Sequence, residues 1–166
     1  GLGSQADISV ATGDDNAMDV AALEKALRRS IEKGERIAAI VVTMGSTDAF
    51  GVDDIEAVHA LRQRLVKEYR LDYMPYLHAD AVIGWAYSVF NDYEFDANPL
   101  GIPAEALHSL KLLRERMRHL PLADSLGIDF HKSGYTPYAS SLFLASDAQL
   151  LNPVRRDKVA MPYLFQ

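Results

Sequence analysis

The stretch Ile37-Ala38-Ala39-Ile40-Val41-Val42 decides the fold. It is apolar throughout and lacks the alternation of polar and apolar residues that marks a strand with one wet face. This pattern is typical of a strand that is covered on both faces, as in a parallel sheet between layers of helices. We therefore predict an α/β fold with a mostly parallel sheet and helices on both of its faces.

Helices and strands alternate outward from this run. Apolar residues at helical spacing predict a helix from Val20 to about Lys33, capped by Asp19, and a second helix from Asp54 to about Tyr69, capped by Asp53. The remaining predicted elements are strands at 8–11, 74–79, 125–130 and 140–145 and a helix at 103–120. Such alternation is the signature of parallel strands joined by right-handed crossovers.

The last strand differs from the others. About ten residues separate it from the strand before it, too few for a helical crossover. We therefore expect the fifth strand to pair antiparallel with the fourth. The chain opens on the strand-like run 8–11 and closes on the apolar residues 161–165, so we expect it to be part of a larger domain.

Composition narrows the class of protein. The chain has 166 residues, a net charge of −6, 49% hydrophobic residues and no cysteine. These values indicate a globular domain and exclude disulfides, a thiolate metal site and a cysteine nucleophile. Because there is no long basic run, no long apolar stretch and no signal peptide, we expect no nucleic-acid partner, no membrane span and a cytoplasmic location.

The ends of three predicted strands carry chemically useful side chains. These are Thr43, then His78 and Asp80, and then Asp129-Phe130-His131-Lys132. Singly, each has an ordinary structural interpretation, such as a strand-end hydroxyl, a core histidine, a cap or an ion pair. Ligands of open α/β sheets bind at the carboxyl ends of the strands, so the set together favours a functional site.

An amine beside a carboxylate suits pyridoxal phosphate. A lysine in a dry pocket can form a Schiff base with an aldehyde, and a carboxylate can keep a pyridine nitrogen protonated. Neighbouring histidines can bind the cofactor or relay protons. A zinc site of His78, Asp80 and His131 is a weaker alternative, because Lys132 would place a second cation beside the metal.

The ordered motifs resemble the group II pyridoxal-phosphate-dependent amino acid decarboxylases. They include Leu77-His78-Ala79-Asp80-Ala81, Ala123-Asp124-Ser125 leading to Asp129-Phe130-His131-Lys132, and the upstream Val42-Thr43-Met44-Gly45-Ser46-Thr47. The family includes aromatic amino acid, tyrosine, glutamate and diaminobutyrate decarboxylases. The resemblance implies the large domain of a fold-type I pyridoxal phosphate enzyme, of which residues 1–150 are the central part. It also implies that residues 151–166, an irregular tail, would be the start of a mobile active-site loop.

The resemblance also implies roles for individual residues. Lys132 would carry the Schiff base, and Asp80 would bind the protonated pyridine nitrogen. His131 would lie near the phosphate and the lysine, Thr43 near the ring, and Asp129 against the cofactor.

Three further residues complete this prediction. His78 would support Asp80 from behind, and Val82, where the family usually has a small residue, would lie against the ring face. Tyr163 would match the tyrosine of the mobile loop that supplies a proton, although ordinary packing is the simpler interpretation of that residue. No metal is expected.

The resemblance further implies partners: an amino acid substrate, other segments of the same enzyme, and a homodimer with its active site at the interface. The expected reaction is decarboxylation of an L-amino acid, with this segment inactive alone. The alternatives are another pyridoxal-phosphate-dependent carbon–carbon lyase of the same fold, and a non-catalytic interaction module.

Overall fold

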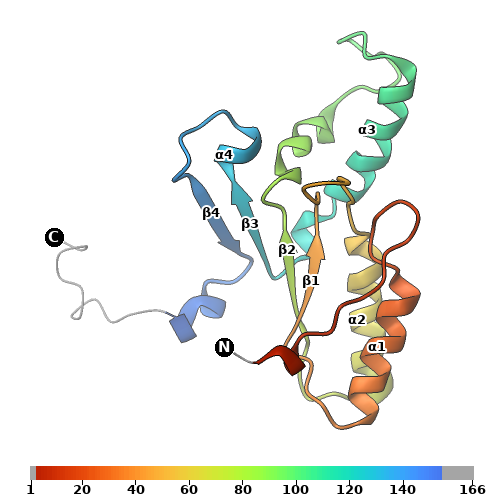
Figure 1. Cartoon of the computed structure of the whole chain (residues 1–166), viewed down its shortest axis with the longest axis vertical. Helices are drawn as coiled ribbons and strands as arrows, with labels where there is room; N and C mark the ends of the chain where they lie inside the picture. The colour runs from red at the N-terminus through yellow and green to blue at the C-terminus, as the bar shows by residue number, and fades with distance from the viewer. Residues whose placement is uncertain (1–2, 155–166) are drawn as a thin grey trace, which may run out of the picture.

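The structure, a computed structural model, describes residues 3–154 (Figure 1). Four α-helices and four strands lie in this range. They are α1 (Val20–Glu32), β1 (Ala39–Thr43), α2 (Ile55–Tyr69), β2 (Tyr76–Asp80), α3 (Ala104–Met117), β3 (Ser125–Asp129), α4 (Phe130–Ser133) and β4 (Ser141–Ala145). Short 3-10 helices at Ser4–Ala6, Gly84–Asp92, Leu120–Leu122 and Ala148–Val154 complete the list.

The sheet has the order β1-β2-β3-β4. β1, β2 and β3 are parallel, whereas β4 pairs antiparallel with β3, as the short connection between them predicts. The fold class predicted from the sequence, an α/β sheet with an antiparallel last strand, is therefore confirmed.

Helices cover one face of the sheet in the described part of the chain. Ile40 and Val42 of β1 are buried, whereas Val41 between them is 53% exposed. The core joins this covered face to α1 and α2, through residues that share near-complete burial: Leu23, Leu27, Ile40, Val42, Ile55, Val58, Leu61, Leu65, Leu77 and Ala79. Figure 1 shows α1 and α2 side by side next to β1 and β2.

The expectation of helices on both faces is thus met on one face only. The chain steps from β1 to β2 to β3 in one direction across the sheet. Right-handed crossovers taken in one direction place every connecting helix on the same face. The opposite face, which carries Val41, stays open among residues 3–154.

The predicted strand at 8–11 does not form. Ile8 is 55% exposed, and no strand pairing among residues 3–154 involves residues 8–11. The nearest pairing is an isolated bridge between Thr12 and Met18, beside a hydrogen bond from the N–H of Asp19 to the carbonyl of Ala11. β1 and β4 leave sheet edges unpaired, but the end of this segment bonds instead to residues just before α1, so it closes the turn that leads into that helix.

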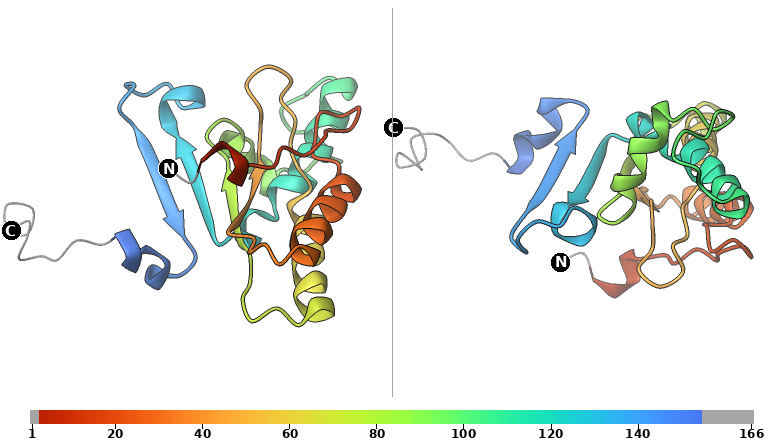
Figure 2. Two further views of the ribbon diagram at one scale, coloured as in Figure 1. Left: turned by 60° about the horizontal axis from the view of Figure 1, so that its bottom comes forward. Right: turned by 90° about the horizontal axis from the view of Figure 1, so that it is seen from above.

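β3 and β4 project away from α1 and α2 (Figure 2). Every residue of β4 before Ala145 is exposed. Within the described residues, none of the helices combines the length and apolar character that a membrane crossing requires.

Candidate active site

The carboxyl ends of β1 and β2 place two predicted site residues side by side. Thr43 is the register partner of Asp80, and Asp80 in turn faces Gly127 of β3. Register partners point to the same face of a sheet, so Thr43 and Asp80 both lie on the open face. The missing side chain of Gly127 leaves room beside Asp80, because a Cβ there would meet only Val82 and His78 at 3.6 and 4.0 Å.

The carboxylate of Asp80 is left with unused acceptor capacity. Its one hydrogen bond among residues 3–154 is a long one, 3.4 Å, from the backbone N–H of Val82. Val82 therefore lies next to the carboxylate, on the turn that follows β2.

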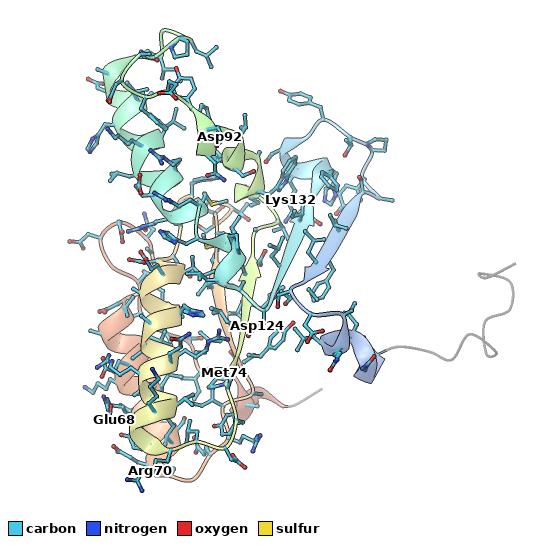
Figure 3. All side chains as sticks on the ribbon, turned by 180° about the vertical axis from the view of Figure 1, so that it is seen from behind. Glu68, Arg70, Met74, Asp92, Asp124 and Lys132 are labelled. Carbon is cyan, nitrogen blue, oxygen red and sulfur yellow. The ribbon has the colours of Figure 1, made fainter. Side chains whose placement is uncertain are left out.

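Lys132 and His131 lie on α4, directly after β3. The sequence predicted that this strand would run to Phe130, but it ends at Asp129, and Phe130 begins the short helix. Figure 3 shows Lys132 where β3 meets α4, at the opposite end of β3 from Asp124.

Asp129 organises the polar groups around the lysine. Its carboxylate accepts a hydrogen bond from Ser141 Oγ at 2.6 Å and lies 3.3 Å from Lys132 Nζ and 3.7 Å from His131 Nε2. The hydrogen bond from Ser141 is the largest cause that lowers the pKa of Asp129; burial opposes it, and the hydrogen bond of Lys132 and the charge of His131 add to the lowering. An ionised Asp129 therefore holds the lysine amine at the end of β3.

Three contacts join the turn after β2 to α4. Trp85 Nε1 donates to the carbonyl of Asp129 at 3.1 Å, and Ser133 Oγ donates to the carbonyl of Ile83 at 3.1 Å. The Trp85 ring also packs edge-on against Phe130, with ring centroids 5.1 Å apart. The segments that carry Asp80 and Lys132 are thus one connected unit.

His78 is held differently from the prediction. It lies on the open face, two residues before Asp80, but its Nδ1 bonds to Ser125 Oγ at 2.7 Å and its ring stacks on Phe143 at 5.8 Å. None of the hydrogen bonds in the described part of the chain joins His78 to Asp80. His78 therefore links β2 to β3 through Ser125, two residues before Asp80 along β2.

Tyr163 and His131 are the remaining predicted residues of the site. Tyr163 lies outside the described residues. The ring of His131 packs against that of Tyr138 at a tilt of 32°, with centroids 4.5 Å apart, and its Nδ1 lies 3.4 Å from the carbonyl oxygen of Ser140. Among residues 3–154, no group of three or more His, Asp or Glu side chains is arranged to hold a metal ion.

Two features of the site are not apparent from the sequence. Asp53, predicted as the cap of α2, is buried and bonds to backbone groups of other segments, while Asp54 caps the helix through the N–H of Ala57. Gly84 is also required, because a Cβ there would fall 1.8 Å from the carbonyl oxygen of Met44. The turn after β2 thus packs directly on the loop after β1.

Comparisons with known proteins confirm the resemblance seen in the motifs. The L-tyrosine decarboxylase of Enterococcus faecium is 29% identical over 177 residues, which cover 100% of this chain and 28% of that protein. The chain therefore spans little more than a quarter of the length of this curated relative. No protein-family model matches the chain.

Solved structures that match this fold include a glutamate decarboxylase domain and a pyridoxal phosphate complex. The glutamate decarboxylase domain of a diaminobutyrate-pyruvate transaminase and L-2,4-diaminobutyrate decarboxylase from Vibrio parahaemolyticus has a TM-score of 0.64 at 22% identity, covering 94% of this chain and 28% of that one. A structure of Oryza sativa TDC with PLP has a TM-score of 0.63 at 20% identity, covering 87% and 25%. At these identities the likeness shows the fold.

Proposed function

We propose that this chain forms the central part of the cofactor-binding domain of an enzyme that decarboxylates an L-amino acid with pyridoxal phosphate. One observation carries the proposal. Asp80 and Lys132 come from the ends of neighbouring parallel strands, and Thr43 is paired beside Asp80 on the same open face.

The groups present fit this cofactor. Asp80 keeps free acceptor positions for a protonated ring nitrogen, and the side chain of Lys132 is 37% exposed, so its amine is reachable. Gly127, the β3 residue opposite Asp80, places no side chain beside the carboxylate. When bound, pyridoxal phosphate supplies an aldehyde that bonds to amines and a ring that withdraws electrons.

The residues of this chain would bind the cofactor, orient the reactive amine and carry protons. Asp80 would hold a proton on the ring nitrogen, and Lys132 would be the attachment point. Asp129, fixed by Ser141, would orient the lysine amine, with His131 as a further proton-carrying group within reach. In the reaction the bond between Cα and the substrate carboxylate breaks, CO2 leaves, and a proton takes its place on Cα.

Covalent trapping tests the cofactor assignment. The protein that carries this chain is incubated with pyridoxal phosphate, reduced with borohydride, digested and mapped by mass spectrometry. The label is expected on Lys132 and is expected to vanish in Lys132→Ala but not in Lys111→Ala, a surface lysine that faces Asp96 at 3.8 Å. A label at another lysine, or none, rejects the proposal.

Product analysis tests the reaction. L-Tyrosine, L-2,4-diaminobutyrate, L-glutamate and L-tryptophan are offered in turn, and release of CO2 with the matching amine is measured. We expect one of them to be decarboxylated. Cleavage of a side-chain carbon–carbon bond without release of CO2 would instead indicate a lyase of another type.

We also propose a cytoplasmic homodimer in which the partner subunit covers the loop after Lys132. Tyr135 and Tyr138 on this loop are almost fully exposed, which is unusual for aromatic side chains beside a candidate site. Light scattering should show a dimer, and Tyr135→Ser should weaken it. Cell fractionation should recover the protein in the cytoplasm. A monomer, or a protein recovered outside the cytoplasm, contradicts it.

A further inference from the structure

The carboxylate of Asp53 is buried and uses both of its oxygens on backbone groups. Asp53 is 4% exposed. Its Oδ1 accepts a hydrogen bond from the N–H of Met18 at 2.6 Å, and its Oδ2 accepts one from the N–H of Thr43 at 2.7 Å. The N–H of Asp53 donates in turn to the carbonyl of Thr43 at 2.9 Å. One side chain therefore joins the segment before α1 to the end of β1.

These bonds reach the candidate site through Thr43 and Met44. Thr43 is the register partner of Asp80, and the N–H of Met44 donates to the carbonyl of Asp80 at 2.8 Å. The backbone of Asp80 thus bonds to Met44 and pairs with Thr43, the residue before it, whose N–H and carbonyl both bond to Asp53. Asp53 itself lies between β1 and α2, outside the strands of the sheet.

Arg116 supports this arrangement from α3. Its guanidinium donates to the carbonyl of Val52, the residue before Asp53, and to Asp15 Oδ2 at 2.7 Å. The Asp15 carboxylate also accepts a hydrogen bond from the N–H of Ala17, next to Met18, at 3.1 Å. Arg116 therefore holds both segments that the Asp53 carboxylate joins.

Burying the charged carboxylate of Asp53 opposes folding, because it removes the charge from water. Burial raises the pKa of Asp53, although the two backbone donors and the charge of Arg116 oppose that effect. Helix capping does not explain the residue, because Asp54 performs it. What only a carboxylate provides here is two acceptor oxygens that face two N–H groups on different segments.

We propose that Asp53 is a positioning residue of the candidate site, which holds Thr43 and Met44 against Asp80, and that Arg116 keeps Asp53 in place. The inference rests on the proposed function, because the affected property is cofactor binding at Asp80 and Lys132. Asp53→Asn is nearly isosteric but replaces one acceptor oxygen by an NH2 group, which would face a backbone N–H. The end of β1 would then shift relative to Asp80.

The test compares Asp53→Asn with Asp54→Asn in the protein that carries this chain. The Kd of pyridoxal phosphate, the absorbance maximum of the bound cofactor and Tm are measured for each. Asp53→Asn is expected to raise the Kd about tenfold, as the loss of a partner of a binding group typically does, and to shift the absorbance. Asp54→Asn is expected to lower Tm slightly and leave both cofactor readouts unchanged.

A second pair of variants keeps the inference testable if Asp53→Asn does not fold. Arg116→Gln should weaken cofactor binding, whereas Arg118→Gln, which removes an exposed arginine paired at 3.4 Å with Glu115, should not. A lower Tm with Kd values within about twofold of the unsubstituted protein would show a structural role only and overturn the inference. Failure of the unsubstituted protein to bind the cofactor would overturn the proposed function itself.

Discussion

The two faces of the sheet differ in what their side chains do. On the covered face, Leu77 and Ala79 of β2 are fully buried against α1 and α2. On the open face, His78 and Asp80 of the same strand are hydrogen-bonded or reachable. Because strand residues alternate between faces, five residues of β2 serve both the core and the candidate site. Substitutions one position apart should therefore separate stability from function.

The largest expected effect is on the covered face. Leu77→Ala should lower the free energy of unfolding by about 2–5 kcal/mol, because it leaves a cavity where a 0% exposed side chain was. Val41→Ala on the open face should cost less than about 1 kcal/mol. Denaturant unfolding measures both, and equal losses would show that the open face is part of a second core.

Asp80→Asn, on the open face, should lower activity and leave stability unchanged. We expect kcat/KM to fall on the order of 10²–10³-fold, as for loss of one preorganised electrostatic group, with Tm unchanged. The control is Asp72→Asn, an exposed aspartate that faces Arg36 at 3.5 Å. If Asp80→Asn lost stability rather than activity, the division between the two faces would be wrong.

The sequence predicted much of this division, for physical reasons. Strand ends are marked by the change from apolar residues to Thr43, Asp80 and Asp129, and parallel pairing brings such ends together. The antiparallel β4 followed from the length of the connection alone. Asp19 was predicted to cap α1, and it does so through the N–H groups of Ala21 and Ala22.

Other features depend on contacts that a single sequence does not display. The run 37–42 is apolar on both sides, yet only one side is covered by residues 3–154. Asp53 and Asp54 are equally good caps by type, and only the fold shows which of them is buried. The start of α4 at Phe130 was missed because Phe130 also suits a strand.

A smaller loss of stability is expected when the hydrogen bond between His78 of β2 and Ser125 of β3 is removed. Ser125→Ala removes the partner of His78 Nδ1 and should cost about 1 kcal/mol of folding free energy. The control Ser109→Ala removes a bond from an exposed hydroxyl to the carbonyl of Glu105 and should cost less. Thermal unfolding distinguishes them, and a neutral Ser125→Ala would mean that His78 is held by Phe143 alone.

The smallest expected effect is on the pH dependence of stability, in which Asp129 and Asp53 should contribute with opposite signs. The pKa of Asp129 is lowered, so its ionised form stabilises the fold above the unfolded-state pKa of about 4, and this contribution is lost as pH falls through the folded-state pKa. The raised pKa of Asp53 has the opposite sign: its stabilising contribution is present at low pH and is lost as pH rises through the folded-state value.

Ser141→Ala removes the main cause of the shift at Asp129. The Tm difference from the unsubstituted protein should therefore be present near neutral pH and shrink as pH falls below about 4. Ser133→Ala removes a bond to the uncharged carbonyl of Ile83, so its Tm difference should not depend on pH. A Ser141→Ala effect that stayed constant down to acid pH would mean that the hydroxyl contributes packing rather than stabilising the ionised carboxylate, and Asp129 would then hold Lys132 without that help.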